Sequence, residues 1–321
     1  MISMISPTLS LVIISYNMRR ELPRTLYSLS RLYQRDIQHV DYEVIVVDNG
    51  SQQPPHATDF QDLDLPLRCL HAPNPTCSPA AAINFGIEQT SGHWVGVWID
   101  GARIASPRLV ATALEALNRS PHAIVATRGR YLGPGPQSQT MQRGYNQVSE
   151  DLLLNRCDWK NHGYRLFANS VFDESSGPTW FADMSESNAL FLSKSHWEEL
   201  GGYDERFTSP GGGLVSLDTW QRAISLPRVV PIALLGEATF HQFHGGTMTN
   251  AADQAARWKS LCSEYEAIRG TQWSWPQVPL TYWGRFHEPP PPSELVSHGS
   301  GWSSAWSKII TEVQRPRRFF P

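Results

Sequence analysis

The chain has 321 residues, of which 40% are hydrophobic and 11% aromatic, enough to build the buried core of a globular protein. Its formal net charge of −3 excludes a broad nucleic-acid-binding face, because such a face needs a basic stripe to neutralise phosphates. No apolar run approaches the roughly 18–20 residues that span a bilayer, and the first residues lack a signal-peptide pattern. We therefore expect a cytoplasmic protein without a transmembrane segment.

Absent motifs exclude further classes. The sequence has no GxGxxG after its first expected strand, no GxxxxGK[ST], no GxSxG and no HExxH. Simple dinucleotide-binding, P-loop, α/β-hydrolase and zincin functions therefore lack their characteristic parts. The cysteines are widely and irregularly spaced without a CxxC pair, which predicts free thiols. They are Cys69, Cys77, Cys157 and Cys262.

The first 130 residues alternate short β-branched runs with helical patterns. Strands are expected at residues 9–15, 42–48, 67–70, 94–99 and 123–127. Helices are expected at residues 21–34, 78–90 and 109–117. The pairs Ser78-Pro79 and Ser106-Pro107 match helix starts with proline at the first helical position. Such alternation is typical of a mostly parallel sheet with helices on both faces.

After residues 133–136 (Gly-Pro-Gly-Pro) the alternation weakens. We expect a helix near Asp151, a strand at residues 189–192, and helices at residues 195–200 and 216–224. Beyond about residue 251 the chain holds six tryptophans and a proline run without clear periodicity, so this part either wraps the domain or binds a partner. The predicted organisation is a domain of residues 1–260, with halves 1–130 and 131–260, and a Trp/Pro-rich extension of residues 261–321.

Polar residues follow three of the expected strands, at Tyr16-Asn17, Asp48-Asn49 and Asp100-Gly101. In parallel sheets, ligands bind beyond the carboxyl ends of the strands, so these residues converge on one binding edge. Asp48 there can accept hydrogen bonds from a ribose or a base, although Asp-Asn-Gly-Ser is also an ordinary turn sequence. Asp100 is placed for a divalent cation or a ribose hydroxyl, and the alternative is a turn stabilised by neighbouring backbone N–H groups.

Two histidines add possible metal ligands. A spacing of three would put His241 and His244 on opposite faces of a continuous strand, so we expect only His241 to face the site. The predicted metal ligands are Asp100 and His241. The alternative for a lone histidine is a hydrogen-bonded packing role.

A third carboxylate, Asp218, falls near the start of the expected helix 216–224, behind the glycine-rich residues 210–213. A carboxylate delivered there can act as a general base toward an attacking hydroxyl. The alternative is a helix-capping aspartate, which the helix dipole favours.

In this order, these segments resemble glycosyltransferase family 2, the nucleotide-sugar-dependent transferases of the GT-A fold, over roughly residues 9–250. Residues 9–17 and 42–51 are similar to the family's first two strands, and residues 84–87 to the segment before its metal-motif strand. Residues 99–102 fall where the family has its DxD motif, but Ala102 replaces the second acid. Residues 201–207, followed by Asp218 and Arg222, resemble the acceptor-side signature that holds the catalytic base, with Leu217 replacing its acidic neighbour.

The resemblance implies an α/β fold of the GT-A type, a Rossmann-like mostly parallel sheet flanked by helices, with a less regular acceptor-binding half. It implies an inverting transferase that moves a sugar from a nucleoside-diphosphate sugar to a hydroxyl of a saccharide or glycoconjugate acceptor in polysaccharide or glycoconjugate biosynthesis. Asp218 is then the general base. The implied cofactor is Mn²⁺ or Mg²⁺, although the DxD-like motif is degenerate.

The resemblance also assigns the substrate-binding residues. The implied donor-binding residues are Ser15, Tyr16, Asn17, Asp48, Asn84, Asp100 and Arg103. The predicted acceptor wall is formed by Trp180, Phe181, Asp183 and Glu186. For Arg103 the alternative is an exposed turn residue, and for the aromatic residues of the wall it is core packing.

Two other functions stay open. Ala102 and Leu217, at normally acidic positions, are compatible with a catalytically impaired protein that binds sugar nucleotides or acts as a scaffold. A nucleotidyltransferase is less favoured because no Gly-rich basic loop follows Ser15. Residues 315–320 are basic and aromatic, which is compatible with a peripheral membrane contact.

Overall fold

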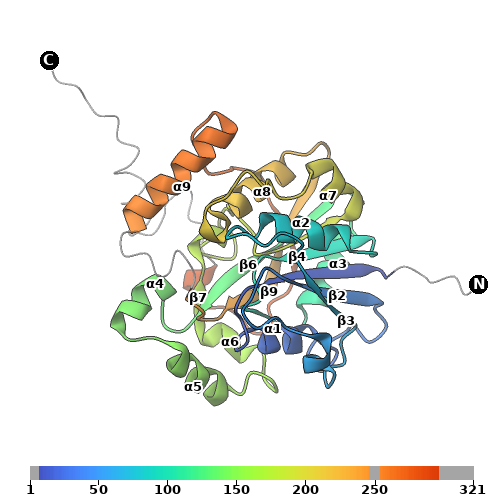
Figure 1. The fold of residues 1–321 in the computed structure, drawn as a ribbon. Coiled ribbons are helices and arrows are strands. Elements are labelled where there is room, and N and C mark those ends of the chain that lie inside the picture. The colour runs from blue at the N-terminus through green and yellow to red at the C-terminus, as the bar shows by residue number, and fades with distance from the viewer. Residues whose placement is uncertain (1–6, 246–253, 296–321) are drawn as a thin grey trace, which may run out of the picture.

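A computed structural model describes residues 7–245 and 254–295, which form an α/β fold around one central sheet (Figure 1). The strands are β1 (Leu9–Ser15), β2 (Tyr42–Asp48), β3 (Leu67–His71), β4 (Trp94–Trp98), β5 (Arg103–Ala105), β6 (Ala123–Leu132), β7 (Ser170–Phe172), β8 (Ala189–Ser193), β9 (Val230–His241) and β10 (Thr281–Gly284). Their order is β10-β9-β6-β8-β4-β1-β2-β3, with β5 paired to β9 and β7 paired to β6. The sheet therefore joins both halves of the chain.

The helices follow the expected alternation in the first half of the chain. They are α1 (Leu22–Leu29), α2 (Ala80–Glu88), α3 (Leu109–Leu117), α4 (Gln137–Thr140), α5 (Gln147–Cys157), α6 (Arg165–Ala168), α7 (Lys194–Leu200), α8 (Val215–Ile224) and α9 (Gln254–Arg269). Helix α1 ends earlier than predicted because Ser30 leaves the helical conformation, with ψ of 161°. At α2 the N-cap position is Pro79 rather than Ser78.

The sheet is mixed but mostly parallel, as the sequence predicts. Strands β1, β2, β3 and β4 are parallel neighbours, and β6, β9 and β10 form a second parallel set. Strand β8 runs antiparallel between β4 and β6 and joins these sets. The carboxyl ends of β1, β2 and β4 therefore share one edge, where a ligand site is expected.

Helices cover both faces of the sheet (Figure 1). Val12 and Ile14 of β1 belong to the core cluster formed with α2, α7, α8 and α9, whereas Leu11 and Ile13 belong to the cluster formed with α1 and α3. Successive residues of a strand point to opposite faces, so β1 is apolar on both sides. This explains why the strands of the first half read as continuous hydrophobic runs.

Strand β6 continues five residues beyond its predicted end at Thr127 and carries two buried arginines. The guanidinium of Arg128 donates hydrogen bonds to the carbonyls of Ser176, Trp180 and Ala182. Arg130 pairs with Glu294 at 2.9 Å. The strand can continue through these charged residues because partners distant in sequence satisfy them inside the protein.

The C-terminal part packs on the domain. Helix α9, which the sequence analysis did not predict, places Trp258, Leu261 and Tyr265 in the same core cluster as α8, and Trp273 follows them. The expected division at residue 260 falls inside this helix. Strand β10 pairs with β9. Trp302, Trp306 and the basic residues 315–320 lie outside the described residues.

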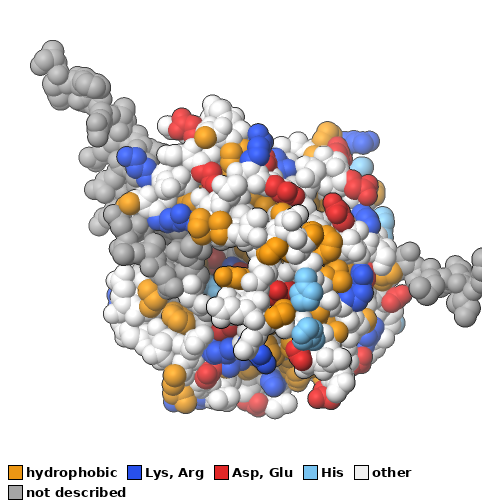
Figure 2. Space-filling view, in the orientation of Figure 1, with side chains coloured by type: hydrophobic (Ala, Val, Ile, Leu, Met, Phe, Trp, Pro, Cys, Tyr) orange, Lys and Arg blue, Asp and Glu red, His pale blue; other side chains and the backbone are white. Residues whose placement is uncertain are grey.

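Two general expectations can be compared with the structure. All four cysteines are free thiols, as predicted. No helix in residues 7–245 and 254–295 is long and apolar enough to cross a bilayer. On the face drawn in Figure 2, basic and acidic side chains are interspersed, and no continuous basic stripe crosses the part formed by the described residues.

Candidate active site

Asp100 lies in the turn after β4. Its Oδ1 accepts a hydrogen bond from the Ala102 backbone N–H at 3.0 Å, and its Oδ2 accepts one from Arg103 Nε at 2.8 Å. Burial by itself would raise the pKa of Asp100, but the Arg103 guanidinium beside it holds the pKa well below its usual range. Asp100 is therefore a fixed anion, and the backbone contact of the turn alternative is also present.

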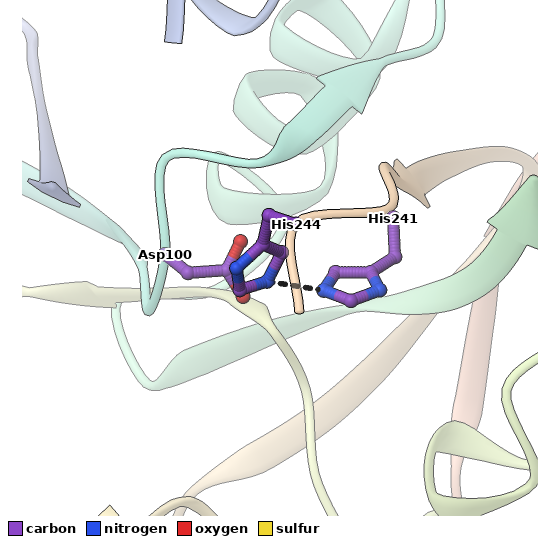
Figure 3. Close-up of side chains that lie close together, drawn as sticks. All are labelled: Asp100, His241 and His244. Atoms are coloured by element: carbon purple, nitrogen blue, oxygen red, sulfur yellow. Dashed lines mark hydrogen bonds between the residues drawn. The ribbon is translucent and has the colours of Figure 1, made fainter. Parts of the chain in front are cut away.

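Both histidines face Asp100 (Figure 3). Their Nε2 atoms lie 3.0 Å apart, and one ligand atom each of Asp100, His241 and His244 fall within 4.8 Å of one another. We expected only one histidine to face the site. The structure differs because β9 ends at His241, so the chain turns back and the alternation of a continuous strand does not apply.

The tautomer of His241 is set by Gln137. The Gln137 amide donates to the His241 carbonyl at 3.0 Å, so its Oε1 faces His241 Nδ1, also at 3.0 Å, and accepts a hydrogen bond from it. Burial lowers the pKa of His241 well below its usual value, which keeps the ring neutral. Nε2 of His241 then presents a lone pair toward Asp100 and His244, the arrangement of a histidine prepared to bind a metal ion.

Arg103 is buried, with 6% of its surface exposed, so the exposed turn alternative is wrong. Strand β5 pairs antiparallel with β9, and the register places Arg103 opposite His241. The Nη1 atom of Arg103 is buried without a hydrogen-bond partner among residues 7–245 and 254–295. A guanidinium N–H without a partner beside Asp100 can bind an anionic oxygen of a ligand.

Ser15 and Asp48 meet at the ends of β1 and β2, where the register pairs them. Asp48 Oδ2 accepts hydrogen bonds from the N–H groups of Gly50 and Ser51, as in the turn alternative. Asp48 Oδ1 and Ser15 Oγ, however, are buried without hydrogen-bond partners in the part of the chain that the structure describes. Such atoms cost free energy unless a ligand or water pairs with them. They support the predicted binding edge.

Tyr16 and Asn17 follow β1 at the same edge. Tyr16 is 56% exposed, and Asn17 adopts a left-handed conformation with φ of 53°. The Asn17 side chain accepts a hydrogen bond from the Gln52 backbone at 3.0 Å, and its own N–H donates to Ser51 Oγ at 2.7 Å. Asn17 therefore joins the loops after β1 and β2.

Asn84 lies elsewhere. It sits in the middle of α2, where its amide accepts a hydrogen bond from the Tyr203 N–H and donates to the Tyr203 carbonyl and to Glu205, all at 2.8 Å. These contacts tie α2 to the loop after α7. The structure does not bring Asn84 together with the other predicted donor residues.

Asp218 is held by two arginines and is 1% exposed. Its Oδ2 accepts hydrogen bonds from Arg222 Nε and Arg269 Nη2, each at 2.7 Å, and its Oδ1 accepts one from Arg269 Nε at 2.6 Å. Arg269 also pairs with Asp204. Within the described residues, Asp218 has no ion pair or hydrogen bond to the side chains around Asp100. This network includes α9, which the sequence analysis did not predict.

The four residues of the predicted acceptor wall do not share one surface. Trp180 is 1% exposed and packs against Phe172 and Phe286, as in the core-packing alternative. Phe181 is partly buried against Tyr282, and Asp183 is exposed. Glu186 is buried and lies near the Asp100 site, where Arg103 and Asp100 affect its titration.

Two residues of the site were missed by the sequence analysis. Tyr131 lies opposite His241 in the β6–β9 register, and their rings meet edge to face with centroids 5.6 Å apart. Gln137 orients His241 from α4. Tyr131 could have been found only by extending β6 through Arg128 and Arg130, and nothing in the sequence around Gln137 indicates its partner.

The comparisons with known proteins can now be set beside this geometry. The fold is that of the GT-A glycosyltransferases: the structure of S. aureus TarS residues 1–349 in complex with UDP-GlcNAc matches with a TM-score of 0.51 at 15% sequence identity. The match covers 81% of this chain and 66% of that one. A second structure of the same TarS fragment matches with a TM-score of 0.49 at 12% identity, over 82% of this chain and 72% of that one. At these identities the likeness concerns the fold.

The sequence model of glycosyl transferase family 2 matches residues 10–177. The chain belongs to this family. No curated protein matches the chain.

Proposed function

We propose that this protein transfers a sugar, with inversion, from a nucleoside-diphosphate sugar to a hydroxyl of a saccharide or glycoconjugate acceptor. The observation that carries this proposal is the cluster of Asp100, His241 and His244 at the sheet edge of a family 2 chain. The unpartnered atoms of Ser15 and Asp48 at the ends of the neighbouring strands support a nucleotide site there. The UDP-GlcNAc bound by the TarS structure is compatible with such a donor.

The three ligands fit a divalent cation. Two imidazoles and one carboxylate favour a transition metal such as Mn²⁺ over Mg²⁺, which prefers oxygen ligands. Bound there, the cation would neutralise charge on the departing diphosphate. Arg103 supplies a fixed positive charge at the same edge, and its Nη1 is free to donate to a phosphate oxygen.

The sequence predicts Asp218 as the general base of this reaction. Because both of its oxygens accept hydrogen bonds from arginines, we do not assign the base to it. We expect Asp218→Asn to lower the free energy of unfolding by about 2 kcal/mol, since it leaves two partly buried guanidinium groups poorly paired. If this variant folds normally but loses transfer activity at least a hundredfold, Asp218 is the base after all.

The proposed function is tested by calorimetric titration with UDP, GDP, dTDP and CMP, each with and without Mn²⁺. We expect one nucleoside diphosphate to bind, and to need Mn²⁺ for tight binding. The corresponding sugar nucleotide is then assayed for transfer over a panel of saccharide acceptors. No binding of any nucleotide would contradict the proposal. Binding without turnover of any donor, including hydrolysis, would instead favour the impaired binding protein.

His244 provides the sharper test of the metal site, because only the structure assigns it. We expect His244→Ala to weaken Mn²⁺ binding at least about tenfold without changing the fold, since one of three ligands is lost. His39→Ala, which removes an exposed histidine, is the control. Unchanged Mn²⁺ affinity of the His244 variant in calorimetry would contradict a site built on these three residues.

A further inference from the structure

Two buried carboxylates lie beside the Asp100 site. Asp173 follows β7 and is 5% exposed, and Glu186 precedes β8 and is 9% exposed. The Ser175 hydroxyl lies between them, 2.7 Å from Asp173 Oδ1 and within hydrogen-bond distance of Glu186 Oε1. We call these three residues the acid bridge.

The hydrogen bonds of the acid bridge require one of its carboxyl groups to be protonated. A serine hydroxyl has one hydrogen and can donate it to only one of two carboxylates. The second carboxylate can bond to Ser175 only if it carries a proton itself, and two buried carboxylates so close together cannot both remain charged without cost. Because Asp173 Oδ1 accepts the Ser175 hydrogen, Glu186 carries the proton of its own hydrogen bond to Ser175 in this arrangement.

The two carboxylates differ in how many hydrogen bonds their oxygens already accept. Asp173 Oδ1 accepts from both the N–H and the hydroxyl of Ser175, and the Tyr131 hydroxyl hydrogen-bonds to the Asp173 carboxylate. Glu186 bonds only through Oε1, so its Oε2 accepts no hydrogen bond from the described residues. Oε2 is therefore the oxygen that can accept a hydrogen bond from a hydroxyl group of a ligand.

Neighbouring strands connect the acid bridge to the metal ligands. The sheet register places Arg103, His241 and Tyr131 side by side on β5, β9 and β6. Tyr131 then reaches Asp173. The charged and titratable groups that face Glu186 come from several elements. Asp173, Arg103 and Asp100 affect the pKa of Glu186. The charge of Glu186 in turn raises the pKa values of Tyr131 and Tyr203.

Buried polar groups without hydrogen-bond partners lie near the acid bridge. Within the described residues, both amide atoms of Asn188, a residue 1% exposed, have no hydrogen-bond partner, and neither does Nη1 of Arg103. A β-carbon at Gly129 would meet the Asn188 amide nitrogen, Asp173 Cβ and Ser176 Oγ, each at 3.4 Å, so Asn188 and Asp173 face the same point of β6. Buried donors and acceptors without partners indicate that a polar ligand completes the site.

We propose that Glu186 is the general base of the sugar transfer and that Asp173 and Ser175 are its positioning residues. The inference rests on the proposed function. Glu186 Oε2 takes the proton of the acceptor O–H while the acceptor oxygen bonds to the anomeric carbon. The bond from that carbon to the diphosphate oxygen breaks, and its electron pair leaves with the nucleoside diphosphate. Glu186 then releases the proton to solvent.

The titration of Glu186 suits this role. Burial and the charge of Asp173 raise the pKa of Glu186 to about 7, despite the lowering effects of Ser175 and Arg103. A base with a pKa near the working pH combines sufficient deprotonated fraction with sufficient proton affinity. The active form is deprotonated, so the turnover rate rises with pH through this pKa.

The test compares Glu186→Gln with Glu198→Gln, which neutralises an exposed carboxylate on α7. Since the acceptor is not identified, the probe is hydrolysis of UDP-, GDP- and dTDP-sugars, with water as the acceptor. We expect Glu186→Gln to lower the turnover rate about 10²–10⁴-fold while Mn²⁺-dependent binding of the nucleoside diphosphate stays within threefold. Glu198→Gln leaves both unchanged.

The positioning role of Ser175 is tested by the pH–rate profile. Ser175→Ala removes the bridging hydroxyl, and we expect it to shift the acidic limb of the pH–rate profile without changing nucleotide binding. If Glu186→Gln keeps the wild-type turnover rate and acidic limb while nucleotide binding is intact, Glu186 is not the base, although the proposed function stands. If the wild-type protein neither binds nor turns over any sugar nucleotide, both proposals fail.

Discussion

At the residue scale, Ala102 explains how the site differs from the family's DxD pattern. Ala102 is fully buried in the core cluster that contains Met18 and Leu22. Its N–H donates to Asp100, and its carbonyl accepts from the Gln242 N–H, so the backbone here is fixed from both sides. An acidic side chain at this position would be directed into apolar packing. The imidazoles of His241 and His244 lie beside Asp100 instead.

This leads to a prediction for Ala102→Asp, the change that would restore the second acid of the motif. We expect it to lower the free energy of unfolding by about 3 kcal/mol or more, because it buries a carboxylate without a partner. Mn²⁺ affinity should not improve. Urea unfolding and calorimetry measure the two quantities, and tighter Mn²⁺ binding in a stable variant would show that position 102 still faces the metal site.

At the element scale, α2 packs on the sheet through a glycine. A β-carbon at Gly86 would lie 3.0 Å from Val47 Cγ2 and closer still to Val12 Cγ1, both within buried strands. Replacing glycine by alanine in a helix ordinarily stabilises it by about 1 kcal/mol. Here the helix would have to move away from β1 and β2, which carry Ser15 and Asp48.

We therefore expect Gly86→Ala to be destabilising by about 1–3 kcal/mol, the cost of overpacking a core, opposite in sign to its helix propensity. Glu88→Ala, at an exposed position of the same helix, should stay within about 0.5 kcal/mol of the wild type. Urea unfolding of the two variants decides between packing and propensity. A stabilised Gly86→Ala protein would mean that α2 has space above the strands.

At the scale of the whole molecule, buried carboxyl groups make stability depend on pH. Glu237 on β9 accepts hydrogen bonds from Ser106, Arg108 and Tyr164. Burial nevertheless raises its pKa to about 7. Between the unfolded pKa near 4.5 and this value, the folded protein binds more protons than the unfolded chain. This contribution to stability is present in full below the unfolded pKa and is lost as the pH rises through 7.

The prediction concerns the difference between the wild type and Glu237→Gln, which keeps the shape of the protonated side chain. We expect the free energy of unfolding of the wild type, relative to the variant, to fall by an amount on the order of 3 kcal/mol between pH 5 and pH 8. Denaturant unfolding at several pH values measures it. A difference that is constant with pH would mean that Glu237 titrates normally in the folded protein.

The local sequence pattern by itself determined the strands and helices of the first half of the chain and the place of two site carboxylates. Apolar runs and helix-start residues gave β1, β2, β4 and the helices between them, because strand and helix periodicity are local properties of the chain. Asp48 and Asp100 could be placed at the binding edge from sequence, because parallel strands end at a common edge. The family resemblance followed from the same segments.

Only the tertiary structure decided what surrounds these carboxylates. Arg103 is buried because β5 pairs with a strand more than a hundred residues later in the chain, and His244 joins the site because β9 ends at His241. The charge of Asp218 is balanced by Arg269 from α9, and Glu186 meets Asp173 through Ser175. The burial of Arg103 and the pairing of Asp218 depend on contacts between segments far apart in the sequence. Residue type and local spacing carry no record of which distant group will neutralise a charge, share a proton or complete a ligand set.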